Sequence, residues 1–490
     1  MRNIFYSLLA MAVIGSSCQK KVIDVVPQNL LPYDLAFSTP ERIEKAVLSG
    51  YDALQSADFL SGRALVYVDA MGEDVFDLNT YFGDLPRFSM LSNNGIASAV
   101  WTAGYNAIAS ANRAADGIAA HSGVISADQA KQYIAECKFV RAVSNFYLVN
   151  FYGQPYAFTA DASHPGIPLI MQSFSSNDSA ANVPRSTVKA VYDAIIKDLT
   201  DALADIPTTY GDTYDDKTRG TKASVSSFLS RVYLYKGDYA NAKKYAADVI
   251  AGTYGTFKLQ SDPAAPFAIG NYQTAETIWS IPNNANDNPN TNNALPQHYS
   301  PYGRGDLALS KSFIDIATNP YFALDDKRRD MIIPGDPASG TQSYWFTSKY
   351  TDITSRADWA PIIRYPEVLL TYAEAQARLA TGVDADAIAK LNVVRDRSKA
   401  ATTPSYTAAD FASKDALIAA ILGERRIELA FEGHRFWDLM RTKTTVTNKY
   451  NGDGATLLKP EPFGANNNVF PIPQVEIDKS KGVLKQNTGY

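Results

Sequence analysis

The chain has 490 residues, of which 46% are hydrophobic, so it can bury a large core and is long enough for about two to four domains of ordinary size. Its formal net charge of −5 argues against a nucleic-acid partner and against electrostatic attachment to anionic lipid. With 29 Tyr against 22 Phe and 5 Trp, its rings suit partly wet surfaces, because Tyr carries a polar tip.

The first 17 residues have the features of a targeting segment. Arg2 supplies a positive charge, and the apolar stretch at 4–14 is too short to span a bilayer, which needs about 20 residues. The small residues 15–17 precede Cys18 and resemble a lipoprotein cleavage site. We therefore predict a signal peptide, a lipid anchor on Cys18 and a tether over 18–36. The alternative is ordinary signal-peptidase cleavage that leaves Cys18 free.

Cysteine usage agrees with this prediction. The chain has two cysteines, and if Cys18 is acylated, Cys137 has no partner. We therefore predict no internal disulfide. No later stretch is apolar enough to cross a membrane, so we expect the rest of the chain to lie on one side of it.

The clearest repeat unit covers 221–252. An apolar helix that reaches Tyr235 is followed by a turn at 236–238 and by a second helix whose small Ala residues allow close approach, as in the 34-residue tetratricopeptide unit. Because such units bury their faces only by stacking, we predict a mainly α fold. Its form would be a tetratricopeptide-like α-α superhelix of about four helix pairs, with long irregular insertions that carry a few short strands. The other pairs combine 40–56 with 98–120, 128–151 with 186–205, and 366–380 with 385–398.

Four intervals rich in Gly, Pro, Asn, Asp and Tyr interrupt the helical pattern. The third is far longer than loops normally run without a purpose, so we predict that it holds short strands, turns and one or two helices packed on the repeats. We also place ligand binding there. The intervals are 57–96, 156–184, 253–361 and 442–475.

The insertion at 253–361 carries residue types that suit a sugar. Flat rings cover the C–H faces of a sugar, and polar groups meet its hydroxyls, so a site needs a few convergent polar groups on an apolar floor. Each ring has a plainer interpretation, which is packing of the insertion against the helices. The candidate rings are Tyr299, Tyr302, Tyr344, Trp345, Phe346 and Trp359, and the candidate polar partners are Asn283, Asn286, Arg304 and Asp306.

An enzyme is not predicted. The four His residues are scattered without metal-ligand spacing, and neither a GxSxG elbow nor a phosphate-binding Gly loop is present. The acidic segment 69–77 leaves two other functions open. Two carboxylates are enough for glycoside hydrolysis, and a polar loop of this kind could take a calcium ion, although its spacing misses the EF-hand pattern. We predict no cofactor, no catalytic residue and no metal site.

The run from Glu424 to Arg441 combines Arg and carboxylate residues with aromatic residues, on two helices joined at Gly433. Residues three apart are neighbours on a helix surface, and Arg suits partly buried carboxylate pairs. We predict a structural ion-pair network that locks one helical hairpin, the alternative being a catalytic acid–base cluster. The predicted pairs are Arg425–Glu428, Glu432–Arg435, Arg435–Asp438 and Asp438–Arg441.

This run resembles the C-terminal hallmark of the SusD/RagB family, which are lipid-anchored binding proteins that sit over outer-membrane nutrient transporters. Other segments are similar to the family's motifs in the same order, which makes coincidence a poor explanation. Cys137 stands where the family usually has Ala. The matching segments are 37–54, 101–118, 136–156, 183–207, 362–379 and 469–490.

The resemblance implies a nutrient-capture lipoprotein on the outer face of the outer membrane of a Bacteroidetes-type bacterium. It would bind an oligosaccharide, or less often a peptide, and act as a lid on a SusC-like, TonB-dependent β-barrel transporter. Two alternatives stay open: a peptide-capturing lid of the RagB type, and a tetratricopeptide-like scaffold that binds protein partners. We divide the chain into a SusD-like helical repeat region at 37–252, a ligand-binding insertion at 253–361 and a SusD/RagB helical region at 362–490, within one compact unit.

Overall fold

The computed structural model describes residues 33–174, 183–336 and 343–490. The predicted signal peptide, Cys18 and most of the predicted tether lie outside these ranges. Within them, helices are either too short or too polar to cross a bilayer. Cys137 is a buried free thiol, and burial raises its pKa.

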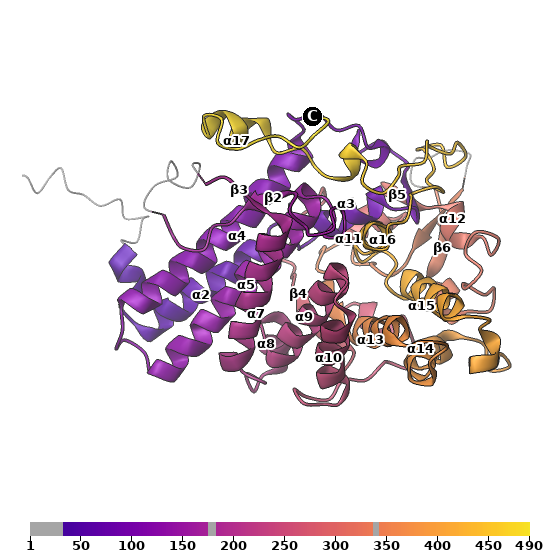
Figure 1. Cartoon of the computed structure of the whole chain (residues 1–490), viewed down its shortest axis with the longest axis horizontal. Coiled ribbons are helices and arrows are strands. Elements are labelled where there is room, and N and C mark those ends of the chain that lie inside the picture. Colours follow the sequence, from indigo (N-terminus) through magenta and orange to yellow (C-terminus); the bar gives the residue numbers. More distant parts are fainter. Residues whose placement is uncertain (1–32, 175–182, 337–342) are drawn as a thin grey trace, which may run out of the picture.

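Eight helices form a continuous row, and they include every pair that the sequence predicts (Figure 1). The predicted pairs are α2 with α4, α5 with α7, α9 with α10, and α13 with α14, and each pair also packs on the next. The mainly α fold is confirmed, whereas the tetratricopeptide-like superhelix stays a prediction. The row consists of α2 (Pro40–Leu54), α4 (Gly95–Ala120), α5 (Ala127–Tyr152), α7 (Val188–Asp205), α9 (Lys222–Lys236), α10 (Tyr239–Ile250), α13 (Tyr365–Leu379) and α14 (Ala385–Ser398).

The ends of these helices follow from local chemistry. Thr39, Ser126, Thr187 and Thr221 each precede a helix and accept a hydrogen bond from the backbone N–H three residues later. Gly237 ends α9 with a φ of 78°, a left-handed conformation that glycine adopts without steric cost. The turn of the clearest repeat unit therefore falls where the sequence predicts it.

Shorter elements fill the intervals between the helices of the row. The interval 57–96 holds a buried helix, α3, that the sequence analysis did not predict. These elements are η2 (Tyr33–Phe37), α3 (Arg63–Met71), η3 (Leu85–Arg87), α8 (Thr213–Thr218), η4 (Ala265–Phe267), α11 (Leu295–Tyr299), α12 (Lys311–Ile314), η5 (Lys327–Met331), η6 (Ala408–Asp410), α15 (Lys414–Glu428), α16 (Arg435–Arg441), η7 (Asn466–Asn468) and α17 (Gln474–Lys479).

The strands pair in four antiparallel two-stranded sheets within the described residues, and most of them lie in or beside the long insertion. The pair that matters most for the site joins β1 to β5, with Asp77 opposite Leu307. It brings the loop after β1 next to the loop before β5. The pairs are β1 (Val75–Asp77) with β5 (Leu307–Leu309), β2 (Pro165–Pro168) with β3 (Arg185–Thr187), β4 (Thr277–Ile281) with β8 (Ala360–Arg364), and β6 (Ile332–Gly335) with β7 (Tyr344–Thr347).

One large apolar core runs through the molecule from Phe37 to Leu484, and a second lies among α13, α14 and α15. A small satellite cluster of Phe76, Ala308 and Phe346 lies where β1 and β5 meet β7. The insertion is therefore built into the apolar core of the molecule at several points.

The charged run at 424–441 forms an ion-pair network, but its partners differ from the predicted ones. Asp438 and Arg441 pair as predicted, with Oδ1 and Nε 2.6 Å apart. Arg425 instead pairs with Asp438 across the Gly433 turn, at 2.9 Å, and Arg435 pairs with Glu73 at 2.8 Å. The predicted offsets within a single helix turn are wrong for these two residues, because the helices turn them toward other segments.

Glu428 and Glu432 also find distant partners. Arg364, at the end of β8, contacts both carboxylates, with N···O distances of 3.1 and 2.6 Å. The same guanidinium contacts Glu276 at 2.5 Å, and Lys349 contacts Glu432 at 2.7 Å. Burial would raise the pKa of Glu432, but the neighbouring Arg364 and Lys349 hold it below its ordinary value. We name these five residues the buried charge cluster.

Candidate functional site

The loop after β1 presents Tyr81, and buried groups fix its position. The Asp77 carboxylate accepts hydrogen bonds from the backbone N–H groups of Tyr81 and Phe82, at 3.0 and 2.9 Å. Burial raises the pKa of Asp77 to about 6 in spite of these bonds. The Leu78 N–H donates to the Asp306 carbonyl at 2.8 Å, so the two loops beside the β1–β5 sheet are bound together.

Two guanidiniums lie beside the Tyr81 ring. The Arg304 Cζ is 4.1 Å from the ring centroid, within the range of a cation–π contact, and the Arg63 Cζ is 5.8 Å from it. An Arg63 nitrogen also donates to the Tyr81 hydroxyl at 2.6 Å. Arg304 donates to the side-chain oxygen of Asn292 at 3.0 Å, and the Tyr81 hydroxyl donates to the Asn292 carbonyl at 3.2 Å.

A buried pair beneath this group holds Arg304 in place. Asp306 accepts from the Arg304 Nε at 2.9 Å and lies 2.8 Å from the Nδ1 of His298. Burial raises the pKa of Asp306, but these two hydrogen bonds bring it below its ordinary value. Burial also lowers the pKa of His298. Arg304 is therefore fixed from below, and the side chain keeps 30% of its surface exposed.

The same turn carries the most exposed large ring among the described residues. Tyr302 is 74% exposed and lies two residues from Arg304, and Asn79 donates to the Arg304 carbonyl at 3.2 Å. An exposed ring, a half-buried ring, two exposed amides and two partly exposed guanidiniums therefore lie on adjoining turns over a rigid base. We name this surface the shelf, and its residues are Arg63, Asn79, Tyr81, Asn292, Tyr302 and Arg304.

The β6–β7 hairpin lies beside this turn, because Gly335 packs closely against Pro301. Within it, Trp345 pairs with Pro334 and is 48% exposed, whereas Phe346 is fully buried in the satellite cluster. Tyr344 is half-buried and meets Phe76 edge to face. Side chains alternate across a strand, so the Phe346 ring points into the core while its neighbour Trp345 points outward. The predicted ligand contact is therefore wrong for Phe346.

Three other predicted ligand residues have structural roles. Tyr299 is fully buried and its hydroxyl donates to Asp69 at 2.7 Å. Asn283 is buried and accepts from Ser61 at 2.7 Å. Asp306 is buried under Arg304, where it fixes the guanidinium and does not reach the surface. These positions correct the prediction of surface contacts, whereas Asn286 is exposed, as a ligand contact requires.

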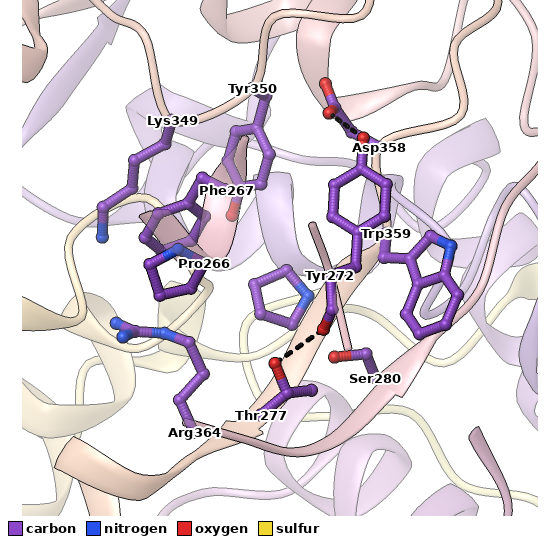
Figure 2. Close-up of a pocket in the computed structure, with 11 residues that line it drawn as sticks. Pro266, Phe267, Tyr272, Thr277, Ser280, Lys349, Tyr350, Asp358, Trp359 and Arg364 are labelled. Carbon is purple, nitrogen blue, oxygen red and sulfur yellow. Dashed lines mark hydrogen bonds between the residues drawn. The ribbon is translucent and has the colours of Figure 1, made fainter. Parts of the chain in front are cut away.

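Trp359 lines a tight hollow (Figure 2). Its ring stacks on Tyr272 with centroids 5.5 Å apart, and the Tyr272 hydroxyl donates to Asp358 at 2.8 Å. The room inside is about 10 Å³, which is about enough for one water molecule. Because Trp359 is 8% exposed, this hollow offers no platform for a sugar ring.

The acidic segment 69–77 is not an open polar loop. Glu73 pairs with Arg435 at 2.8 Å, and Asp74 pairs with Arg426 at 2.6 Å. Asp69 accepts from Tyr299 and from the backbone N–H of Gly433, and burial raises its pKa to about 7. In the part of the chain that the structure describes, no group of three or more His, Cys, Asp or Glu side chains is placed to hold a metal ion.

Comparison with known families accounts for most of the chain. The sequence model of the SusD family matches residues 334–490, and a second model, described as starch-binding associating with outer membrane, matches residues 35–234. The chain belongs to the SusD/RagB family. The resemblance inferred from the sequence motifs is thereby confirmed.

Relatives within the SusD/RagB family cover nearly the full length. SusD-like protein P2 of Formosa agariphila is 25% identical over 100% of this chain and 99% of its own. The crystal structure of a SusD superfamily protein from Bacteroides fragilis has a TM-score of 0.80 at 26% identity and covers 91% of this chain and 99% of its own. A putative sugar binding protein from Bacteroides vulgatus has a TM-score of 0.76 at 24% identity, covers 92% of this chain and 99% of its own, and shows the same fold.

Sequence reasoning missed four members of the shelf on this SusD/RagB scaffold. Arg63, Asn79 and Tyr81 lie in the interval 57–96, where we recognised irregular structure but sought no ligand contact. Asn292 lies inside an Asn-rich run from which we chose Asn283 and Asn286. A Tyr within a polar segment that follows a short apolar strand is the signal that could have identified Tyr81.

Proposed function

We propose that this chain captures a carbohydrate on the shelf and releases it unchanged. The observation that carries the proposal is that Tyr302, which is 74% exposed, lies two residues from Arg304, which the buried Asp306 fixes. A tyrosine ring can cover the C–H face of a sugar, and guanidinium and amide groups can hydrogen-bond its hydroxyls. Because Asp306 fixes Arg304 before binding, less conformational entropy is lost when a ligand arrives. The starch-binding family matched at residues 35–234 and the similarity to the putative sugar binding protein from Bacteroides vulgatus support a carbohydrate.

The test uses residues 18–490 with Cys18→Ser, which removes the predicted acylation site. Calorimetry would measure binding of neutral oligosaccharides, uronate-bearing oligosaccharides and short peptides. We expect saturable binding of an oligosaccharide with a dissociation constant of about 1 mM or lower, and a loss of about tenfold or more in Tyr302→Ala and in Arg304→Ala.

The matched control is Phe158→Ala, another exposed ring, which contacts His164 and lies outside the shelf. Its affinity should equal that of the parent chain. Two results would contradict the proposal: equal affinity in both shelf variants, or binding of peptides alone. Turnover of any bound oligosaccharide by the pure chain would contradict release without chemistry.

The cellular role follows the family. The chain is a lipoprotein held by Cys18 on the outer face of the outer membrane, where it acts as a lid that delivers oligosaccharide to a SusC-like, TonB-dependent transporter. The description "associating with outer membrane" supports the location. Metabolic labelling with a fatty acid should mark the parent chain and not Cys18→Ser, and a β-barrel transporter should copurify from outer membranes. Label in both chains, or purification without a barrel, would contradict this role.

A further inference from the structure

A groove lies beside the Asn-rich loop, which we define as residues 283–294. Its volume is about 370 Å³, which falls within the roughly 300–1,000 Å³ of sites for small organic ligands. The hollow around Trp359, by contrast, has room for about one water molecule. The groove is lined by the end of α2 and the residues after it, by α4, and by the Asn-rich loop. The polar lining residues are Asp52, Gln55, Ser56, Asn106, Asp287 and Asn288.

The groove and the shelf share two chain segments. One runs from Ala57, in the groove wall, to Arg63 on the shelf, and the other runs from Pro289 in the groove wall to Asn292 on the shelf. Since an extended chain spans at most about 3.6 Å per residue, Pro289 and Asn292 lie within about 11 Å of each other. A short oligosaccharide covers that distance.

The shared wall is fixed along its length. Ser61 donates to Asn283 at 2.7 Å, and Arg63 donates to the Asn292 carbonyl at 3.3 Å. Gly62 lies so close to the Asn293 carbonyl that an added Cβ would stand 2.1 Å from its oxygen. The groove and the shelf therefore keep one spacing, as two parts of a single site require.

The chemistry of the groove differs from that of the shelf. Aromatic and basic residues are not among the side chains that line it, whereas amides, a hydroxyl and two carboxylates are. Asp52 and Asp287 form no ion pair within the described ranges of the chain. Carboxylates accept strong hydrogen bonds from hydroxyl groups and repel other carboxylates and sulfates, so this lining suits an uncharged sugar.

We propose that the groove is a second subsite, which takes a neutral part of the oligosaccharide that the shelf holds. The shelf would bind one end through a ring and a guanidinium, and the groove would bind the other end through hydrogen bonds alone. This inference rests on the proposed function and adds two features to it: the part of the ligand in the groove is uncharged, and the ligand is long enough to reach both subsites.

The test fills the groove without touching the shelf. Asn106 is an exposed residue of α4 that lines the groove, so Asn106→Trp should place an indole in it while the chain still folds. The control is Ala119→Trp, an exposed position on the same helix about 20 Å away, given a rise of 1.5 Å per residue. Thermal melting would show that both variants are folded.

The probes are malto-, cello-, xylo- and laminari-oligosaccharides from the disaccharide to the heptasaccharide, together with oligogalacturonates of matched length. For the series that binds, we expect affinity to rise with length in the parent chain and in Ala119→Trp. In Asn106→Trp the shortest ligand that binds should keep its affinity, and the longest should lose about tenfold, which removes the gain with length.

The possible outcomes separate the two proposals. If Asn106→Trp binds the longest ligand as the parent chain does, while Tyr302→Ala and Arg304→Ala bind it weakly, the groove subsite is overturned and the shelf stands. If the shelf variants bind normally, the proposed function fails, whatever the groove variant does. Tighter binding of oligogalacturonates than of neutral ligands would overturn the inference that the groove takes an uncharged part of the ligand. Absence of binding in every series would count against both proposals.

Discussion

Two regions of the molecule pair arginine with carboxylate, and the pairs have different structural roles. In the buried charge cluster, Arg364 and its partners Glu276 and Glu432 are all withdrawn from water. On the shelf, Asp306 is buried and Arg304 is partly exposed. Taking two charges out of water is costly and has to be offset by several contacts, whereas an exposed guanidinium stays hydrated. The first arrangement fixes the helical scaffold, and the second holds a guanidinium in one place and leaves part of it exposed.

The largest loss of stability should appear when the Arg364 charge is removed from the buried charge cluster. Arg364→Ala takes one cationic partner away from each of three buried carboxylates, so we expect the free energy of unfolding to fall by about 3–5 kcal/mol. Urea unfolding followed by circular dichroism measures this. Lys131→Ala, which breaks an exposed pair with Asp128, should cost less than about 1 kcal/mol. Equal losses in the two variants would erase the proposed difference between buried and exposed pairs.

The pH dependence of stability tests the same buried scaffold through His434. Burial lowers the pKa of His434 to about 4, against about 6.5 in the unfolded chain. Because the unfolded state binds the proton more readily, the stability that the neutral ring contributes is present above pH 6.5 and is lost as the pH falls toward 4. The loss should be about 3 kcal/mol. The charged groups that face His434 are Glu367, Arg231, Arg425 and Asp438.

His434→Gln removes this proton-binding group and keeps a polar side chain. Unfolding measured in urea at several pH values should show a shallower decline between pH 6.5 and 4 than in the parent chain. The comparison cancels the other groups that titrate in this window. Parallel curves for the two chains would mean that the pKa of His434 is the same in the folded and unfolded states.

A smaller effect on stability is expected on the shelf. Asp306→Asn removes the charge that fixes Arg304, so we expect a loss of about tenfold in oligosaccharide affinity, because Arg304 is no longer held in place before binding. The free energy of unfolding should fall by less than about 2 kcal/mol, since the exposed guanidinium stays hydrated. Calorimetry and urea unfolding of one preparation give both values. A stability loss as large as that of Arg364→Ala would mean that Asp306 stabilises the fold as the buried charge cluster does.

The smallest effect concerns Trp345. It is 48% exposed, whereas the other four Trp residues are buried, so most of the fluorescence that acrylamide can quench should come from this ring. Trp345→Phe should remove most of the quenchable signal and change the free energy of unfolding by less than about 0.5 kcal/mol. Unchanged quenching in the variant would show that another Trp becomes exposed in solution.

Local sequence patterns predicted the helical scaffold well, because residues close in sequence specify where its helices begin and end. Gly237 and the apolar faces beside it identify the α9–α10 pair, and Gly433, with a φ of 76°, separates α15 from α16. The ion-pair partners were less predictable. Helical spacing shows which residues share a face, but it does not show which distant segment lies opposite, so the contact of Arg435 with Glu73 had no local signal.

The shelf was only partly predictable for a similar reason. Tyr299 and Tyr302 are the same residue type, three positions apart, yet one is fully buried and the other is 74% exposed. The difference arises because the side chain of Tyr299 lies against Asp69, a residue about 230 positions away in the sequence. Composition indicated that rings of the insertion could bind a ligand, but only tertiary packing decided which of them reach the surface.

The Asp69 carboxylate also sets an order of assembly. It joins α3, the Tyr299 hydroxyl of α11 and the Gly433 N–H between α15 and α16, so three distant parts of the chain meet at one oxygen. During synthesis the ribosome has to release residue 433 before this junction can close. The loops that form the shelf therefore acquire their final support late, and a chain cut short before α16 would lack it.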